Sequence, residues 1–206
     1  MNRLLLDHRY VEGDAEAPVL LLLHGTGGSP DDILLLGKEL SPSSPMLAPA
    51  GPVSEFGAAR WFRRLAEGVF DTEDVIARAG QLADFVVAAQ KHYGLAGRKL
   101  VAAGFSNGAN IAAAVALLRP EVLTDAALFA AMLPVPDPPV HDLSGTRIFL
   151  SNGRHDPMAP LASSERLVSV LRERSAEVTE HWHPGGHQIT LPGLEAARTW
   201  LTVQPG

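Results

Sequence analysis

The stretch from Lys99 to Leu118, KLVAAGFSNGANIAAAVALL, constrains the fold more than any other part of the chain. It begins with a short apolar run over residues 100–103, which is typical of a buried parallel strand. It ends in an alanine-rich run, which favours a helix packed closely on a sheet. Between the two stands G-x-S-x-G, with Ser106 at its centre. A serine on a sharp strand-to-helix turn has its hydroxyl exposed at the carboxyl end of a sheet, so the stretch predicts a nucleophile rather than a plain surface turn.

Strands and helices alternate along the rest of the chain, which predicts an α/β fold with a mainly parallel central sheet and helices on both faces. The length of 206 residues fits one domain, residues 1–206. Residues 51–68 show no clean period and are interpreted as a partly irregular loop, and the proline-rich residues 134–139 are too short to form a lid. The expected strands are 18–24, 46–48, 100–103, 125–133, 146–151 and 177–183, and the expected helices beyond the central one are 30–40, 71–93, 161–175 and 194–202.

Composition excludes several classes of function. The chain has no cysteine, which rules out disulfides, thiolate metal sites and a cysteine nucleophile. Its net charge is −6 and its basic residues are scattered, so we expect neither nucleic acid nor a membrane as a partner. No run is long enough for a signal-peptide core or a membrane span. We therefore expect a cytoplasmic protein.

A serine hydroxyl becomes a nucleophile when a base takes its proton, and the base needs an acid to orient it. In a fold of this kind the acid and then the histidine follow later strands, at the carboxyl edge of the sheet. Asp156 follows the expected strand 146–151, and His187 follows the expected strand 177–183. Either residue alone could be an ordinary loop residue. Three suitable residue types at three suitable positions predict Ser106, Asp156 and His187 as catalytic residues.

The oxyanion of the reaction needs backbone N–H donors. We assign these to Asn107, which follows the nucleophile, and to Thr26 in the loop HGTGG. That loop lacks the ending of a P-loop and the spacing of a dinucleotide site, so no nucleotide cofactor is expected. His181, His183 and His187 lie near one another in the sequence, but no carboxylate has ligand spacing, and no metal is expected. Five apolar residues are candidates for the substrate pocket, with core packing as the alternative: Phe56, Trp61, Phe62, Leu133 and Met158.

Four blocks in this order, LLLHGTGG, GFSNGANIA, SNGRHDPMAP and GGHQIT, cover essentially the whole chain and resemble the serine α/β-hydrolases. More narrowly, the chain resembles the carboxylesterase/phospholipase group, which includes acyl-protein thioesterase-like and dienelactone-hydrolase-related enzymes. The resemblance implies an α/β-hydrolase fold and the roles assigned above. Two features depart from it. Dienelactone hydrolases proper use a cysteine, which this chain lacks, and the thioesterases usually carry glutamine where this chain has Asn107, which bears on substrate preference.

Together these features predict a serine carboxylesterase that hydrolyses short- to medium-chain carboxylic esters through an acyl-enzyme. An acyl thioesterase or lysophospholipase uses the same residues and stays an alternative. A non-catalytic binding protein with a hydrolase fold is the alternative from another class, although such a protein has no need of all three residues. The expected partner is a small-molecule ester, and a homodimer is left open.

Overall fold

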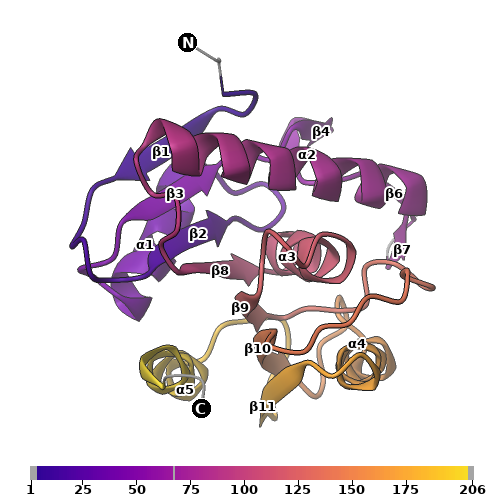
Figure 1. Cartoon of the computed structure of the whole chain (residues 1–206). Helices are drawn as coiled ribbons and strands as arrows, with labels where there is room; N and C mark the ends of the chain where they lie inside the picture. The colour runs from indigo at the N-terminus through magenta and orange to yellow at the C-terminus, as the bar shows by residue number, and fades with distance from the viewer. Residues whose placement is uncertain (1–3, 67, 204–206) are drawn as a thin grey trace.

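The computed structural model describes residues 4–66 and 68–203 and is built on a seven-stranded sheet of order β1-β3-β2-β8-β9-β10-β11 (Figure 1). Strand β1 pairs antiparallel with β3, and all the other neighbours pair in parallel. The predicted mainly parallel sheet is therefore confirmed. Its strands are β1 (His8–Val11), β2 (Val19–Leu23), β3 (Met46–Pro49), β8 (Leu100–Phe105), β9 (Asp125–Phe129), β10 (Arg147–Gly153) and β11 (Glu177–His183).

Helices cover both faces of the sheet, as predicted (Figure 1). Apolar side chains of α2 (Thr72–His92), α3 (Asn107–Leu118) and α4 (Leu161–Glu173) pack into one core layer. Those of α1 (Pro30–Leu40) and α5 (Leu191–Thr202) pack into the other. Strand β2 lies between the two core layers and contributes side chains to both, Leu21 and Leu23 to the first and Leu20 and Leu22 to the second. Because both faces of the strand are buried, every residue after Val19 is leucine.

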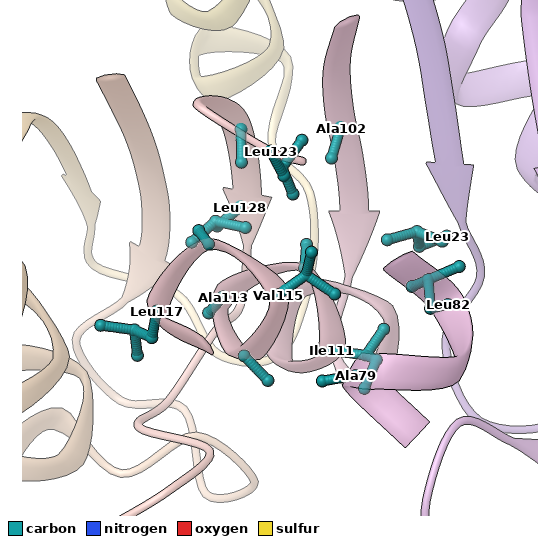
Figure 2. Close-up of a cluster of buried hydrophobic side chains, with 14 of the residues drawn as sticks. Leu23, Ala79, Leu82, Ala102, Ile111, Ala113, Val115, Leu117, Leu123 and Leu128 are labelled. Atoms are coloured by element: carbon teal, nitrogen blue, oxygen red, sulfur yellow. The ribbon is translucent and has the colours of Figure 1, made fainter. Parts of the chain in front are cut away.

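Helix α3 lies in the middle of the larger core layer (Figure 2). Its residues from Asn107 to Leu117 are all buried, which explains an apolar sequence with no polar stripe. Figure 2 shows Ile111 and Val115 of α3 in one cluster with Leu23 and Ala102 of the sheet and with Ala79 and Leu82 of α2. The alanines let the helix approach the sheet closely, and this close packing fixes the position of the turn that precedes it.

The structure corrects the interpretation of residues 51–68 as a partly irregular loop, because short strands lie in and just after this stretch. They form two hairpins, β4 (Val53–Glu55) with β5 (Ala58–Arg60), and β6 (Arg64–Ala66) with β7 (Val69–Phe70). Phe56 and Gly57, at the first turn, both have positive φ, 50° and 87°, as a two-residue hairpin turn requires. Strands this short show no recognisable period in the sequence. The N–H of Gly27 donates to the carbonyl of Ala59 at 2.9 Å, which ties the first hairpin to the loop after β2.

The ends of other elements differ by a few residues from those expected from the sequence. The strand expected over 125–133 ends at Phe129, because Ala130 has a φ of 55° and turns the chain away. Helix α5 begins at Leu191 rather than 194, where the Thr190 side chain accepts from the N–H of Gly193. Residues 130–146, all within the described part of the chain, contain no helix or strand. Among the described residues no helix combines the length and apolar character needed to cross a bilayer.

Candidate active site

Ser106 occupies a strained turn between β8 and α3. Its φ of 54° and ψ of −119° lie in a region that non-glycine residues rarely adopt. Its N–H donates to the carbonyl of Phe129 at 2.8 Å, and its carbonyl accepts from the N–H of Asn110 at 2.9 Å. A Cβ on Gly104 would lie 2.6 Å from the backbone of Gly108, and one on Gly108 would lie 1.9 Å from the carbonyl oxygen of Leu23. Only glycine fits on either side of this turn.

The structure brings Ser106, His187 and Asp156 together in one hydrogen-bonded chain. The Nε2 of His187 lies 2.8 Å from the Oγ of Ser106, although the residues are 81 positions apart. The Nδ1 of His187 lies 2.7 Å from the Oδ2 of Asp156. Each side chain comes from a loop at the carboxyl edge of the parallel strands β8, β10 and β11. An imidazole held in this way can take the proton of a serine hydroxyl.

The carboxylate of Asp156 is held rigidly. Its side chain is 0% exposed, and its Oδ1 accepts from the N–H groups of Met158 and Ala159 at 2.8 and 3.0 Å. These two bonds fix the plane of the carboxylate and leave Oδ2 for His187. A carboxylate in this position sets the tautomer of the imidazole and stabilises its protonated form.

The loop after β2 is supported by the buried side chain of His24. The N–H of Gly51 donates to Nε2 of His24 at 2.9 Å, so Nε2 is the unprotonated nitrogen and Nδ1 carries the hydrogen that reaches the carbonyl of Gly25 at 2.7 Å. Burial lowers the pKa of His24, and the Gly25 hydrogen bond and the charge of Asp32 oppose this only in part. His24 is thus a neutral structural residue that shapes the loop.

Thr26 and Asn107, the predicted oxyanion donors, both lie beside Ser106. Among the hydrogen bonds between described residues, no backbone carbonyl accepts from the N–H of either one. Asn107 is the first residue of α3, where N–H groups have no partner within the helix. The two N–H groups are therefore available to an oxygen bound next to Ser106.

Trp61 links the two segments that carry these donors. Its backbone N–H donates to Oδ1 of Asn107 at 2.7 Å, and its indole N–H donates to the carbonyl of His24 at 2.9 Å. The residue is 1% exposed. Sequence reasoning missed this role because no motif marks it and the hairpin that places Trp61 was not predicted.

A cleft of about 350 Å³ opens next to Ser106 and His187. Its apolar wall includes Ile33 of α1, Phe105 and Met158. Of the five pocket candidates, Met158 is the one in this wall.

The other four pocket candidates require correction. Phe56 is fully exposed at the turn of the first hairpin. Trp61 and Phe62 are buried in the core, where their rings contribute packing rather than a pocket wall. Leu133 lines a separate hollow together with Phe70. The pocket prediction was wrong for the three aromatic residues because their positions depend on the two hairpins, β4–β5 and β6–β7.

No group of three or more histidine, cysteine, aspartate or glutamate side chains in the described ranges is placed to hold a metal ion. His183, one of the histidines considered for zinc, accepts from the N–H of Gly185 through its Nδ1 at 3.2 Å. Its imidazole is buried at the end of β11. That bond supports the loop that carries His187.

A mainly parallel sheet with a serine at the sharp turn after a central strand is the architecture of an α/β-hydrolase. Residues 10–204 match the model of the phospholipase/carboxylesterase family. The putative hydrolase MhqD of Bacillus subtilis (strain 168) is 41% identical over 196 residues, which are 95% of this chain and 97% of that protein. The chain therefore belongs to the phospholipase/carboxylesterase family, and the resemblance given by the four sequence blocks is confirmed.

Solved structures agree with this assignment. The Bacillus cereus carboxylesterase superposes with a TM-score of 0.91 at 41% identity, covering 96% of this chain and 93% of that one. A carboxylesterase from Mesorhizobium loti gives a TM-score of 0.90 at 28% identity, covering 98% and 96%. The chain is thus a carboxylic ester hydrolase by family and by fold, and the prediction of an enzyme of this class is confirmed.

Proposed function

We propose that the protein is a serine carboxylesterase that hydrolyses short- to medium-chain carboxylic esters through a Ser-His-Asp triad. The observation that carries the proposal is the hydrogen-bonded chain from Asp156 through His187 to Ser106, with distances of 2.7 and 2.8 Å. Such a chain activates the serine, orients the base and stabilises its charged form. Each of the three residues therefore has a role in the proposed reaction.

In the first half of the reaction, His187 takes the proton of Ser106 as Oγ attacks the ester carbonyl carbon. The negative charge that develops on the carbonyl oxygen is stabilised by the N–H groups of Thr26 and Asn107. His187 then gives its proton to the ester oxygen as the carbon–oxygen bond breaks, and the alcohol leaves. The product of this half is an acyl-enzyme on Ser106.

In the second half, His187 takes a proton from water, and the hydroxide attacks the acyl carbon. The bond from that carbon to Oγ breaks, and the proton returns from His187 to Ser106. One water is consumed, and one alcohol and one carboxylic acid are released. Asp156 keeps its negative charge throughout and stabilises the imidazolium of His187 in both halves.

The volume of the cleft favours substrates of modest size. Its volume of about 350 Å³ lies at the lower end of the range for small-molecule sites. The apolar side chains of Ile33, Phe105 and Met158 suit an alkyl or aryl group rather than a charged one. A long lipid chain would extend beyond this wall into water, where it gains no binding energy.

Hydrolysis of p-nitrophenyl acetate, butyrate, octanoate and palmitate by the wild type and Ser106→Ala tests the proposal. We expect turnover of the shorter esters, weak turnover of palmitate, and a loss in kcat on the order of 10⁶-fold in the variant. Circular dichroism checks that both proteins are folded. Activity retained in Ser106→Ala, or a preference for palmitate, would contradict the proposal. Matching thioesters, run in parallel, decide between an esterase and a thioesterase.

A further inference from the structure

A carboxylate lines the cleft beside Ser106. It belongs to Asp32, in the first turn of α1, next to the apolar Ile33. Within the described part of the chain, the lining of the cleft contains no lysine, arginine or glutamate. The side chain of His24, also in the lining, is neutral and does not balance the carboxylate. Asp32 therefore sets the charge of the cleft.

The carboxylate of Asp32 is held in place but not neutralised. Its Oδ2 accepts from the hydroxyl of Ser29 at 2.6 Å, and the backbone N–H of Asp32 donates to the same Ser29 oxygen at 3.2 Å. Among the described residues no cation forms an ion pair with Asp32, and no group donates to its Oδ1. A carboxylate has acceptor sites on both oxygens, so Oδ1 is available to a positive group of a substrate.

The negative charge of Asp32 acts on the inside of the cleft. Burial lowers the pKa of His24, and the charge of Asp32 opposes this lowering. His24 is 1% exposed and belongs to the lining of the same cleft. The field of the carboxylate thus reaches a buried group, where water screens it less than at the surface. A positive group placed in the cleft is attracted by the same field.

A role in helix α1 does not account for these features by itself. A negative charge in the first turn favours any helix, and Asp31 and Asp32 share this role. The carboxylate of Asp31, however, pairs with Nε of Arg9 at 2.9 Å and is not part of the cleft lining. Asp32 differs from its neighbour in having an unpaired oxygen at the cleft. Asp31 is therefore a matched control for Asp32.

The position of His187 indicates which part of an ester meets Asp32. His187 belongs to the lining of the same cleft. In the proposed mechanism His187 gives its proton to the oxygen of the leaving alcohol, so the alcohol lies in the cleft. Its alkyl carbons then contact the apolar wall, and Asp32 meets a charged group at the far end of a short alkyl chain.

We infer that Asp32 makes the cleft selective for esters of amino alcohols, with the alkyl part on the apolar wall and the ammonium group beside the carboxylate. The volume of about 350 Å³ has room for a short alkyl chain that ends in such a group. An alcohol that carries a phosphate is repelled by the same charge. This inference rests on the proposed function and adds the class of alcohol to it.

The test compares butyrylcholine with 3,3-dimethylbutyl butyrate, in which a carbon atom replaces the ammonium nitrogen at equal size. The two alcohols differ in intrinsic reactivity, so the measure is how the ratio of their kcat/KM values changes between wild type and variant. Asp32→Asn removes the charge and keeps an oxygen that accepts from Ser29. We expect this variant to lower the preference for butyrylcholine about fivefold, as for a partly exposed ion pair. Asp31→Asn, the same change at the neighbouring position, should leave the preference unchanged.

Hydrolysis of p-nitrophenyl butyrate, which carries no cation, separates the two proposals. If the wild type hydrolyses this ester, but Asp32→Asn leaves the preference unchanged or neither alkyl ester is hydrolysed, the inference is wrong and the esterase proposal stands. If none of the three esters is hydrolysed, calorimetry on Ser106→Ala decides. Tighter binding of butyrylcholine than of the neutral ester, removed by adding Asp32→Asn, means that the selectivity stands and the esterase proposal is wrong. Equal or absent binding of both, together with no hydrolysis, contradicts both.

Discussion

Gly153 at the end of β10 lies directly against the backbone of Gly186. A Cβ on Gly153 would be 2.3 Å from the carbonyl oxygen of Gly186. The N–H of His155 also donates to the carbonyl of Gly185 at 3.1 Å, so the two loops pack backbone against backbone. One loop carries Asp156 and the other His187. The 2.7 Å bond between those side chains therefore depends on the absence of a side chain at position 153.

Gly153→Ala should separate the two loops and misplace His187. Displacements of about 1 Å at a reacting group can cost about 10²-fold in rate, so we expect a loss in kcat of at least that size. Overpacking should cost about 1–3 kcal/mol in the free energy of unfolding. Gly186→Ala is the matched control, because its Cβ would find its nearest neighbour at 3.6 Å. Ester hydrolysis and urea unfolding measure both effects, and a fully active Gly153→Ala enzyme would show that the loop contact does not position the pair.

Asp156→Asn should abolish most activity and leave the fold intact. The asparagine oxygen can still accept from Met158 and Ala159, but its NH2 group would donate to Nδ1 of His187. Nε2 would then carry the hydrogen and could not take the proton of Ser106. We expect kcat to fall about 10⁴-fold with a small change in Tm. Asp142→Asn, on an exposed loop, controls for the change of charge. A loss below tenfold would remove Asp156 from the proposed triad.

The sequence was sufficient to locate Ser106, Asp156 and His187 because topology limits where such residues can lie. Parallel strands end at one edge of the sheet, so residues that follow β8, β10 and β11 converge there whatever the lengths between them. The glycines around Ser106 added a local signal, since each one marks a close backbone approach. Fold class and these three positions were therefore predictable from pattern alone.

The walls of the site were not predictable in the same way. Phe56 and Trp61 lie five residues apart, yet one is fully exposed and the other is buried. The difference arises from the turn at Phe56 and from hydrogen bonds of Trp61 to Asn107 and His24, distant in the chain. Arg60 is buried beside Thr26 for the same reason. Tertiary contacts of short hairpins decide these positions, and hydrophobic periodicity does not report them.

Gly108→Ala should be among the most damaging small substitutions in the chain. Its Cβ would lie 1.9 Å from the carbonyl oxygen of Leu23, and both α3 and β2 are packed in the core. We expect a loss of more than about 3 kcal/mol in the free energy of unfolding, or failure to fold. Gly80→Ala, within α2 and with nothing inside 4 Å, should instead stabilise by about 0.5–1 kcal/mol. Chemical denaturation of both variants checks the contrast, and equal stabilities would contradict the proposed packing.

The lowered pKa of His24 predicts a loss of stability in mild acid. Burial is its main cause, so the unfolded chain, with a pKa near 6.5, takes up a proton at a pH where the folded protein does not. The contribution of His24 to the free energy of unfolding is largest above pH 6.5 and decreases as the pH drops below that value. It stops decreasing once the pH is below the pKa of His24 in the folded protein.

His24→Gln retains an acceptor for the N–H of Gly51 but cannot take up a proton. Just below pH 6.5, the free energy of unfolding of the wild type should fall more steeply than that of the variant, by up to about 1.4 kcal/mol per pH unit. Urea unfolding of both proteins between about pH 7 and pH 5 measures the two slopes. The other histidines contribute equally to both proteins, so the difference between the slopes reports on His24. Parallel curves would mean that His24 is protonated as readily in the folded protein as in the unfolded chain.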